Sequence, residues 1–433
     1  RYSFNLSLNT HNMKNASFVF IVFSLFFSLN SCLKDTCENV YTYQRFDPVF
    51  VKPEVLRQKV AASVSKELVT TGKIYVYGDY LLINEPDLCI HVVDNKVPAN
   101  PKFISFLKIP GNSDLAVRNG LLYADSYIDL VVLDLKNPLD VKEIYRLENA
   151  FPSYGKDEKL GLLVAYKAAG VTETFPCSEN SGNSFFEGNV IWTRDNNSLT
   201  SGLKTPSGTV GIGGSTARFT MNQGLLYTVS TSNLSAFKLE DNGVTKQVST
   251  QNVGWNIETI YPFEGLLLIG SQNGMYIYGI DNPEKPQLLS TFEHWRACDP
   301  VVSDGKTAFV TLRGGTECEG FLNQLDVINI SDVRNPKLIK SYPLYHPIGL
   351  SINQGLLFIC EDDRGIKLYD TKDLNALDKN LIYQDKSFSA VDIIVLEEDK
   401  IAVITGEEGI WQFSYKNPAK WELLSNIKSK TND

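Results

Sequence analysis

The sequence predicts an all-β fold, a single β-propeller of about eight, alternatively seven, four-stranded antiparallel blades. Two observations predict it. An apolar pattern built around a Gly turn recurs at intervals of roughly 40 residues, which is typical of propeller blades. Stretches with the 3.6-residue period of an amphipathic helix are absent after the N-terminal region. Because one such unit cannot bury both of its faces, neighbouring units must pack around a common axis.

The first recurring element is a hairpin in which one apolar strand turns at Gly and continues as a second. Tight hairpins need a positive φ at a central residue, which Gly and Asn tolerate. The clearest copies are Asn119-Gly120-Leu121, Gln223-Gly224-Leu225, Glu264-Gly265-Leu266 and Gln354-Gly355-Leu356. Aligned positions in all the units are Leu81, Leu121, Leu162, Leu225, Leu266, Lys306, Leu356 and Lys400.

The second recurring element is a strand that ends at an Asn-Pro pair or a similar break. Proline cannot donate a hydrogen bond to a neighbouring strand, so it ends the strand. A further apolar stretch, such as Lys337-Leu338-Ile339, then closes the unit. Each unit therefore reads as a meander of four short strands, and the competing prediction is an array of β-sandwiches. The breaks fall at Asn137-Pro138, Asn282-Pro283, Asn335-Pro336 and Asn417-Pro418.

One family resemblance follows from these motifs. The stretch Leu130-Val131-Val132-Leu133-Asp134 resembles the element that names the LVIVD-repeat proteins. The stretch from Asp299 to Thr316, with Cys318 after it, is also similar to that family. The resemblance covers roughly residues 70 to 427, and its regular recurrence is its specific part. It implies a bacterial, often lipid-anchored propeller and brings no established activity.

The N-terminal region predicts export. Residues 1–31 read as a signal peptide whose first twelve residues are an upstream extension. Lys14 supplies the positive charge, and the apolar run from Phe18 to Leu29 is shorter than the roughly 20 residues that span a bilayer. The run ends at Leu29-Asn30-Ser31-Cys32, which resembles a bacterial lipobox, so Cys32 is the predicted lipidation site. A plain secretory signal is the alternative.

The predicted organisation of the mature chain follows from that cleavage. Residues 32–61 form a lipidated tether, and residues 62–433 form the propeller, with an inserted loop at 172–218. Leu33 follows the cysteine. Because Asp at this position retains bacterial lipoproteins in the inner membrane, its absence resembles the sequence of a lipoprotein sorted to the outer membrane. We therefore expect an outer-membrane lipoprotein at the cell envelope, held to the membrane through its lipid anchor only.

Composition limits the partners. Asp and Glu number 50 against 41 Lys and Arg, and no run of basic residues occurs, so a nucleic-acid partner is disfavoured. With only 4 His, no metal site and no cofactor are expected. The expected partner is a protein or a glycan of unknown identity.

The cysteines predict one disulfide. Cys298 and Cys318 bracket a hairpin that turns at Asp304-Gly305, so they are the best pair in an exported chain. The alternative is two separate buried thiols. Cys89 and Cys360 lie within apolar strands and are expected to be core thiols.

Two segments are candidates for binding. The connection that holds Trp295, Arg296 and Asp299 could face a ligand, with Trp stacking and Arg binding an anion; an inter-blade structural role is the alternative. The insertion at 172–218 is either functional or passive. No catalytic residues are assigned. The sequence thus predicts an envelope binding or scaffold module, with a hydrolase or lyase using carboxylates in the central channel as the alternative.

Overall fold

The computed structural model describes residues 38–176, 210–215, 217–293, 300–314 and 323–430. The chain divides into two compact units, residues 1–47 with 167–193 and residues 48–166 with 194–433. The blades of the propeller lie in the second unit. Within the described ranges, none of the helices has the length and apolar character needed to cross a membrane.

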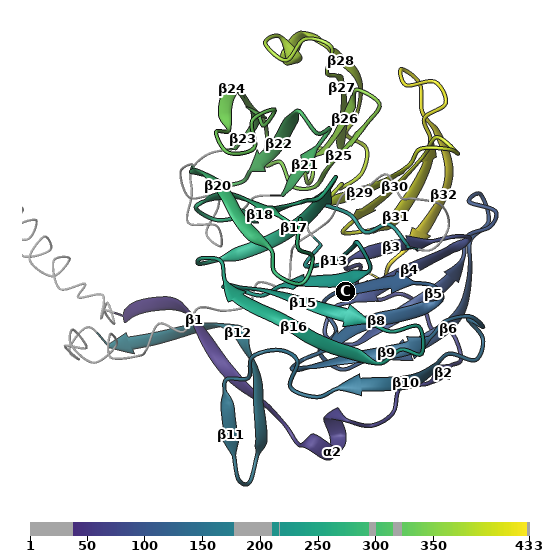
Figure 1. The fold of residues 1–433 in the computed structure, drawn as a ribbon, viewed down its shortest axis with the longest axis vertical. Helices are drawn as coiled ribbons and strands as arrows, with labels where there is room; N and C mark the ends of the chain where they lie inside the picture. The colour runs from purple at the N-terminus through teal and green to yellow at the C-terminus, as the bar shows by residue number, and fades with distance from the viewer. Residues whose placement is uncertain (1–37, 177–209, 216, 294–299, 315–322, 431–433) are drawn as a thin grey trace, which may run out of the picture. The chain divides into compact units, whose positions relative to one another are not determined.

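The blades are seven antiparallel meanders, each made of four consecutive strands (Figure 1). Blades 1 to 4 comprise β3 (Ile74–Tyr77), β4 (Tyr80–Glu85), β5 (Cys89–Asp94), β6 (Lys102–Lys108); β7 (Leu115–Arg118), β8 (Leu121–Ser126), β9 (Asp129–Asp134), β10 (Lys142–Leu147); β13 (Phe219–Asn222), β14 (Leu225–Val229), β15 (Asn233–Leu239), β16 (Thr245–Asn252); and β17 (Ile257–Phe263), β18 (Leu266–Ser271), β19 (Gly274–Gly279), β20 (Gln287–Glu293). Blades 5 to 7 comprise β21 (Val301–Ser303), β22 (Thr307–Leu312), β23 (Gln324–Asn329), β24 (Lys337–Pro343); β25 (Leu350–Asn353), β26 (Leu356–Cys360), β27 (Ile366–Asp370), β28 (Leu381–Asp385); and β29 (Asp392–Leu396), β30 (Ile401–Gly406), β31 (Gly409–Ser414), β32 (Glu422–Lys428).

An eighth sheet has three strands in the order β1-β12-β11. The short strand β2 instead extends blade 1 at its outer edge. Two short helices complete the described elements. The bounds are β1 (Glu38–Val51), β11 (Gly155–Asp157), β12 (Gly161–Pro176), β2 (Ala62–Ser63), α2 (Pro53–Leu56) and η1 (Leu377–Lys379).

The sheets account for the predicted repeat count. The described chain forms eight antiparallel sheets, and the aligned repeat position Leu162 lies in β12 of the three-stranded sheet. Blade 2 nevertheless packs directly on blade 3, because residues of both share one hydrophobic cluster. The four-strand meanders in the ring therefore number seven, which is the alternative count. The all-β propeller prediction is confirmed, and β1 and α2 occupy much of the predicted tether at 32–61.

The Gly turns form as their residues predict. At Asn119-Gly120, φ is 51° and 74°, and at Gln354-Gly355 it is 47° and 78°. Two central residues with positive φ match the right-handed twist of the strands that they join. The copies at Gln223-Gly224 and Glu264-Gly265 have the same geometry.

A β-bulge repeats between the third and fourth strands of all seven blades. It separates the pairing registers at Val92/Val93 in blade 1 and at Gln412/Phe413 in blade 7. A bulge adds local twist to a strand pair. Because the same irregularity recurs in each blade, the seven meanders are equivalent units. The other five positions are Glu143/Tyr145, Ala236/Phe237, Ile277/Tyr278, Val327/Ile328 and Leu368/Tyr369.

The ring closes between blade 7 and blade 1, which lie side by side in Figure 1. The Asn95 and Gln412 amides exchange two hydrogen bonds, of 2.9 and 2.7 Å. The Ser425 hydroxyl donates to the Pro98 carbonyl at 2.6 Å. Leu81 and Ile83 belong to the same buried cluster as residues of β29, β30 and β31. Closure leaves neither terminal blade with an open apolar face.

Candidate functional site

The first strand of each blade lines the centre of the ring, where successive first strands contact one another from β3 through β29. These strands begin at one mouth of the central channel and end at the other. Each mouth holds a cavity, of about 1060 Å³ where the first strands end and about 340 Å³ where they begin. We call them the wide mouth and the narrow mouth.

A segment that contains residues 210–215 and 217 runs through the channel. Ile212 and Val76 of β3 exchange backbone hydrogen bonds of 2.7 and 2.8 Å, and the Tyr75 hydroxyl donates to the Gly211 carbonyl at 3.0 Å. On the other side of the ring, the Leu350 N–H of β25 donates to Ser215 Oγ at 3.2 Å. The segment thus pairs with blade 1 and reaches blade 6.

The glycine at position 211 is required by this close approach. A Cβ there would lie 2.2 Å from the Tyr75 ring and 2.6 Å from the Val76 carbonyl oxygen. Residues 211–215, which are rich in glycine, lie within the insertion at 172–218 that the sequence predicted as a loop. The end of the predicted 172–218 insertion is instead part of the channel wall, and residues 177–209 lie outside the described ranges.

The wide mouth combines an apolar wall with an acidic rim. Its rim is formed by hairpin turns of blades 1, 4, 5, 6 and 7, which end at the same side of the ring. The aliphatic side chains of Val76, Ile212 and Val395 line it together with Phe263. Lining carboxylates outnumber lining ammonium groups by five to one. They are Glu264, Asp304, Glu397, Glu398 and Asp399, against Lys400.

Part of the acidic rim has no ion-pair partner among the described residues. The Gln354 amide donates to Glu397, and Lys400 Nζ donates to Gln354 Oε1 at 3.3 Å. Glu398 and Asp399 form no ion pair with any residue that the structure describes, and both are exposed. These carboxylates are therefore available to a cation in solution.

The narrow mouth is organised differently, around the buried carboxylate of Asp114 in blade 2. Its Oδ2 accepts from Lys73 Nζ of blade 1 at 2.7 Å, and from the Arg218 and Phe219 N–H groups that begin blade 3, at 2.5 and 3.2 Å. Its Oδ1 accepts from the Leu115 N–H at 2.7 Å. One carboxylate thus ties three blades together.

Lys73 and Asp125 extend this network. Burial lowers the pKa of the Lys73 ammonium, and the neighbouring Asp114 carboxylate opposes that shift. Asp125 accepts from Ser113 Oγ at 2.5 Å and from the Asn112 amide at 2.9 Å. The charges of Lys73, Asp114 and Asp125 are paired within the protein, so they act first on stability.

The predicted site residues fall outside the described ranges. Trp295, Arg296, Asp299 and the predicted disulfide partners Cys298 and Cys318 lie in the segments 294–299 and 315–322, and the predicted lipidation site Cys32 lies before residue 38. These assignments stay predictions. Cys89 and Cys360 are both buried free thiols, as expected for core cysteines.

One group of possible metal ligands was not predicted from the sequence. Within the described ranges, Glu85, Cys89 and His91 place one possible ligand atom each within 4.8 Å of the others, and all three are buried. The signal was present in the sequence: a hairpin over 80–94 places residues 85, 89 and 91 on one face. The small number of histidines argues against a multi-histidine site but not against a mixed set of ligands.

The arrangement agrees with known propellers. No family model matches the chain, and no curated protein matches it. Solved structures do. The computationally designed Ika8 protein is 9% identical, with a TM-score of 0.51, over 85% of this chain and 91% of that one. Saccharomyces cerevisiae Sqt1 is 12% identical, with a TM-score of 0.51, over 84% and 87%.

A Lactobacillus plantarum protein is 10% identical, with a TM-score of 0.51, over 86% of this chain and 97% of that one. The chain has the β-propeller fold. Sequence identities this low show the fold alone, so the ligands of these proteins say nothing about the ligand of this chain. The resemblance to the LVIVD-repeat family likewise stays a prediction.

Proposed function

We propose that this chain is an exported, lipid-anchored propeller that serves as a binding module at the cell envelope and receives its partner at the wide mouth. The observation that carries the proposal is the wide-mouth cavity of about 1060 Å³, which has aliphatic side chains in its wall and five carboxylates on its rim, two of which, Glu398 and Asp399, form no ion pair with any described residue. Cavities of this size and mixed lining are typical of binding sites on rigid scaffolds.

The charge of the rim favours one chemistry of partner. Five lining carboxylates against one lysine attract a cation, and the aliphatic wall accepts an apolar group. A basic segment of an envelope protein, carrying Lys or Arg beside an apolar side chain, fits both features. A neutral glycan would gain nothing from the carboxylates as charges, so a glycan partner is the contrary outcome of the test.

The enzyme alternative has one observation in its favour. Lys73 is buried at the narrow mouth with a lowered pKa, as catalytic lysines often are. Its nearest carboxylate, Asp114, is already engaged by two N–H groups of blade 3 as well as by Lys73. A group that holds blades together in this way cannot move freely to serve a reaction, so we favour binding.

A photo-cross-linking amino acid tests the proposal. Placed at Gln354 on the wide rim, where it leaves all five carboxylates in place, it should capture a basic envelope protein, and high salt should reduce that capture because the attraction is between charges. The matched control carries the cross-linker at Leu423, which is 58% exposed on the outer strand β32. Equal products from both positions, or a glycan adduct, would contradict a basic protein partner at the wide mouth.

Lipidation and membrane association are tested separately. Under this proposal, wild-type chain carries acyl label and partitions into detergent, and Cys32→Ala abolishes both. Cys37→Ala is the control, because it changes a neighbouring cysteine and leaves the lipobox intact. A wild-type chain that is cleaved elsewhere and stays soluble would leave the binding proposal standing and remove the lipid anchor.

A further inference from the structure

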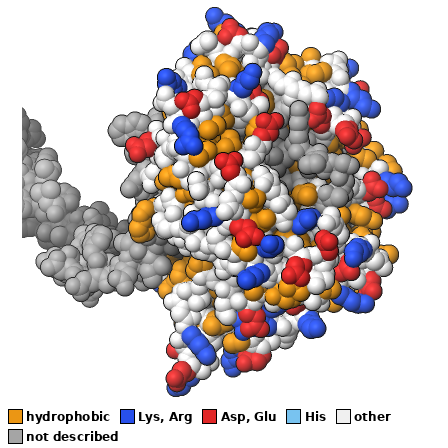
Figure 2. Space-filling model, viewed as in Figure 1, with side chains coloured by type: hydrophobic (Ala, Val, Ile, Leu, Met, Phe, Trp, Pro, Cys, Tyr) orange, Lys and Arg blue, Asp and Glu red, His pale blue; other side chains and the backbone are white. Residues whose placement is uncertain are grey.

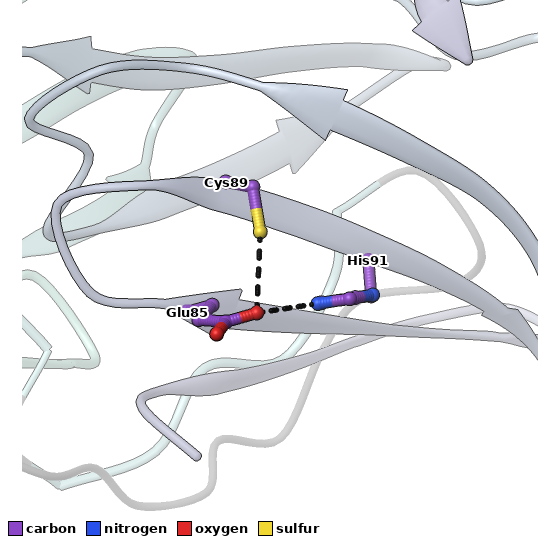
Figure 3. Close-up of side chains that lie close together, drawn as sticks. All are labelled: Glu85, Cys89 and His91. Carbon is purple, nitrogen blue, oxygen red and sulfur yellow. Dashed lines mark hydrogen bonds and ion pairs between the residues drawn. The ribbon is translucent and has the colours of Figure 1, made fainter. Parts of the chain in front are cut away.

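Three side chains of blade 1 that line neither mouth converge at a buried point. The Cys89 thiol donates to Glu85 Oε2 at 3.6 Å, and His91 Nε2 lies 2.9 Å from the same oxygen (Figure 3). Glu85 is 5% exposed, and the other two are fully buried. A buried carboxylate, thiol and imidazole within 4.8 Å of one another form an unusual core contact.

Strand register explains why the three meet. Glu85 of β4 is the direct cross-strand partner of Cys89 of β5, and Ile83 is the partner of His91. Side chains two apart on a strand share a face, so all three point to the same side of the sheet. That side carries Ile83 and Val93, which pack with residues of blade 7 where the ring closes.

The surroundings fix the imidazole without satisfying it fully. The edges of Phe103 and Phe106 contact the His91 ring at centroid distances of 5.5 and 5.3 Å. His91 Nδ1 has no hydrogen-bond partner among the residues that the structure describes. The ring is thus held in place by packing, with Nε2 directed at Glu85.

We propose that Glu85, Cys89 and His91 bind one zinc ion. The donor set suits this metal, since thiolate, imidazole and carboxylate are its three common protein ligands. Charge also favours a divalent ion. A thiolate and a carboxylate carry two negative charges beside a neutral imidazole, so a divalent cation makes the buried group neutral. On binding, the Cys89 thiol proton leaves to solvent.

Two of the three donor–donor distances require little adjustment, and the third, between the Cys89 thiol and the His91 imidazole, lies within 4.8 Å. Tetrahedral donors about 2.0 to 2.3 Å from zinc lie roughly 3.3 to 3.6 Å apart. The sulfur–oxygen distance between Cys89 and Glu85 is already 3.6 Å, and the nitrogen–oxygen distance of 2.9 Å must open by roughly 0.5 Å. Three protein ligands leave a fourth position for water or another donor.

Because all three ligands come from one hairpin at the ring's closing seam, the ion would hold β4 to β5 beside blade 7. This inference is independent of the wide-mouth proposal, since no wide-mouth lining residue belongs to the cluster.

Cobalt binding tests the site in the full-length chain. After chelation under reducing conditions, Co²⁺ added to the wild-type protein should give one equivalent of bound metal with a thiolate-to-cobalt charge-transfer band. Zn²⁺ should displace it and raise the midpoint of thermal unfolding. Absence of the charge-transfer band in folded wild-type protein would overturn the proposal whatever the variants do.

Variants then assign the ligands. Changes that merely disturb ligand orientation cost metal affinity 10–100-fold, so loss of a ligand in Cys89→Ser or His91→Gln should weaken binding at least about 100-fold. The matched controls are Cys360→Ser, a second buried free thiol, and His346→Gln, which lies 2.8 Å from Asp362. Both should bind as the wild type does. Unchanged affinity in folded Cys89→Ser would also overturn the proposal.

Discussion

Charged groups have different roles at the two mouths of the channel. At the narrow mouth, Asp114 accepts hydrogen bonds from three blades and is 3% exposed. At the wide mouth, Glu398 and Asp399 are exposed and form no ion pair within the described chain. Burying a charge costs free energy unless the charge is paired, whereas an exposed charge is hydrated and remains accessible to a binding partner.

This contrast separates stability from recognition. On the face shown in Figure 2, acidic and basic side chains are interspersed. The acidic rim of the wide mouth is set by the turns of five blades. Variants at the two mouths should accordingly change different measurements.

The largest effect should come from opening the ring. Removing residues 390–433 deletes blade 7, exposes the apolar faces of blades 1 and 6, and breaks the Asn95–Gln412 pair. We expect loss of cooperative urea unfolding. A chain ending at Lys430 keeps all described strands and is the control. A cooperatively folded truncated monomer would contradict the closed ring.

Breaking the narrow-mouth network should have the next largest effect. Asp114→Ala leaves Lys73 buried without its carboxylate, and removal of one partner of a buried pair costs about 3–5 kcal/mol. Asp134→Ala is the control. Among the described residues, the Asp134 side chain accepts only from the Lys136 N–H in an exposed turn, so a loss of about 1 kcal/mol is expected. Equal losses in urea unfolding would remove the distinction between the two sites.

The channel segment should show an intermediate effect. Gly211→Ala forces a methyl group against Tyr75 and the Val76 carbonyl, and overpacking of this kind costs about 1–3 kcal/mol. Gly170→Ala is the control, because a Cβ there meets nothing within 4 Å. If Gly211→Ala unfolds at the wild-type urea concentration, the segment does not occupy the channel as described.

The pH dependence of stability tests Lys73 directly. Its folded pKa is lowered by burial, whereas the unfolded chain holds the proton up to the ordinary pKa of 10.5. Between those two values the unfolded state binds more protons, so the free energy of unfolding rises with pH. Lys73→Met lacks this rise. Urea unfolding in a series ending below pH 10.5 should show wild type gaining on the variant; a flat or falling difference would contradict the burial effect.

Local chemistry made much of the fold predictable. Asn119-Gly120 and its copies specify two-residue turns, and these recur with the strand pattern of each blade. The number of blades in the ring was less predictable, because Leu162 carries the repeat signal within a strand of the separate three-stranded sheet. Whether a unit joins the ring depends on which faces pack, and no local pattern records that.

The candidate site was less accessible to sequence reasoning. Asn95 and Gln412, which close the ring, are 317 residues apart, and Asp114 meets Arg218 across 104 residues. Such pairs follow from ring closure, which local patterns do not encode. The Glu85-Cys89-His91 cluster differs, since strand alternation within one hairpin was enough to bring its members to one face.

The most direct test of recognition at the wide mouth is partner capture by a rim variant whose stability should hardly change. The double variant Glu398→Lys with Asp399→Lys reverses the charge of the exposed rim. Its free energy of unfolding should stay within about 0.5 kcal/mol of wild type, as for surface substitutions generally. Its capture of the basic envelope partner by the cross-linker at Gln354 should fall at least about tenfold, a loss of about 1.4 kcal/mol. A double variant that captures the partner as wild type does would contradict recognition at the wide mouth.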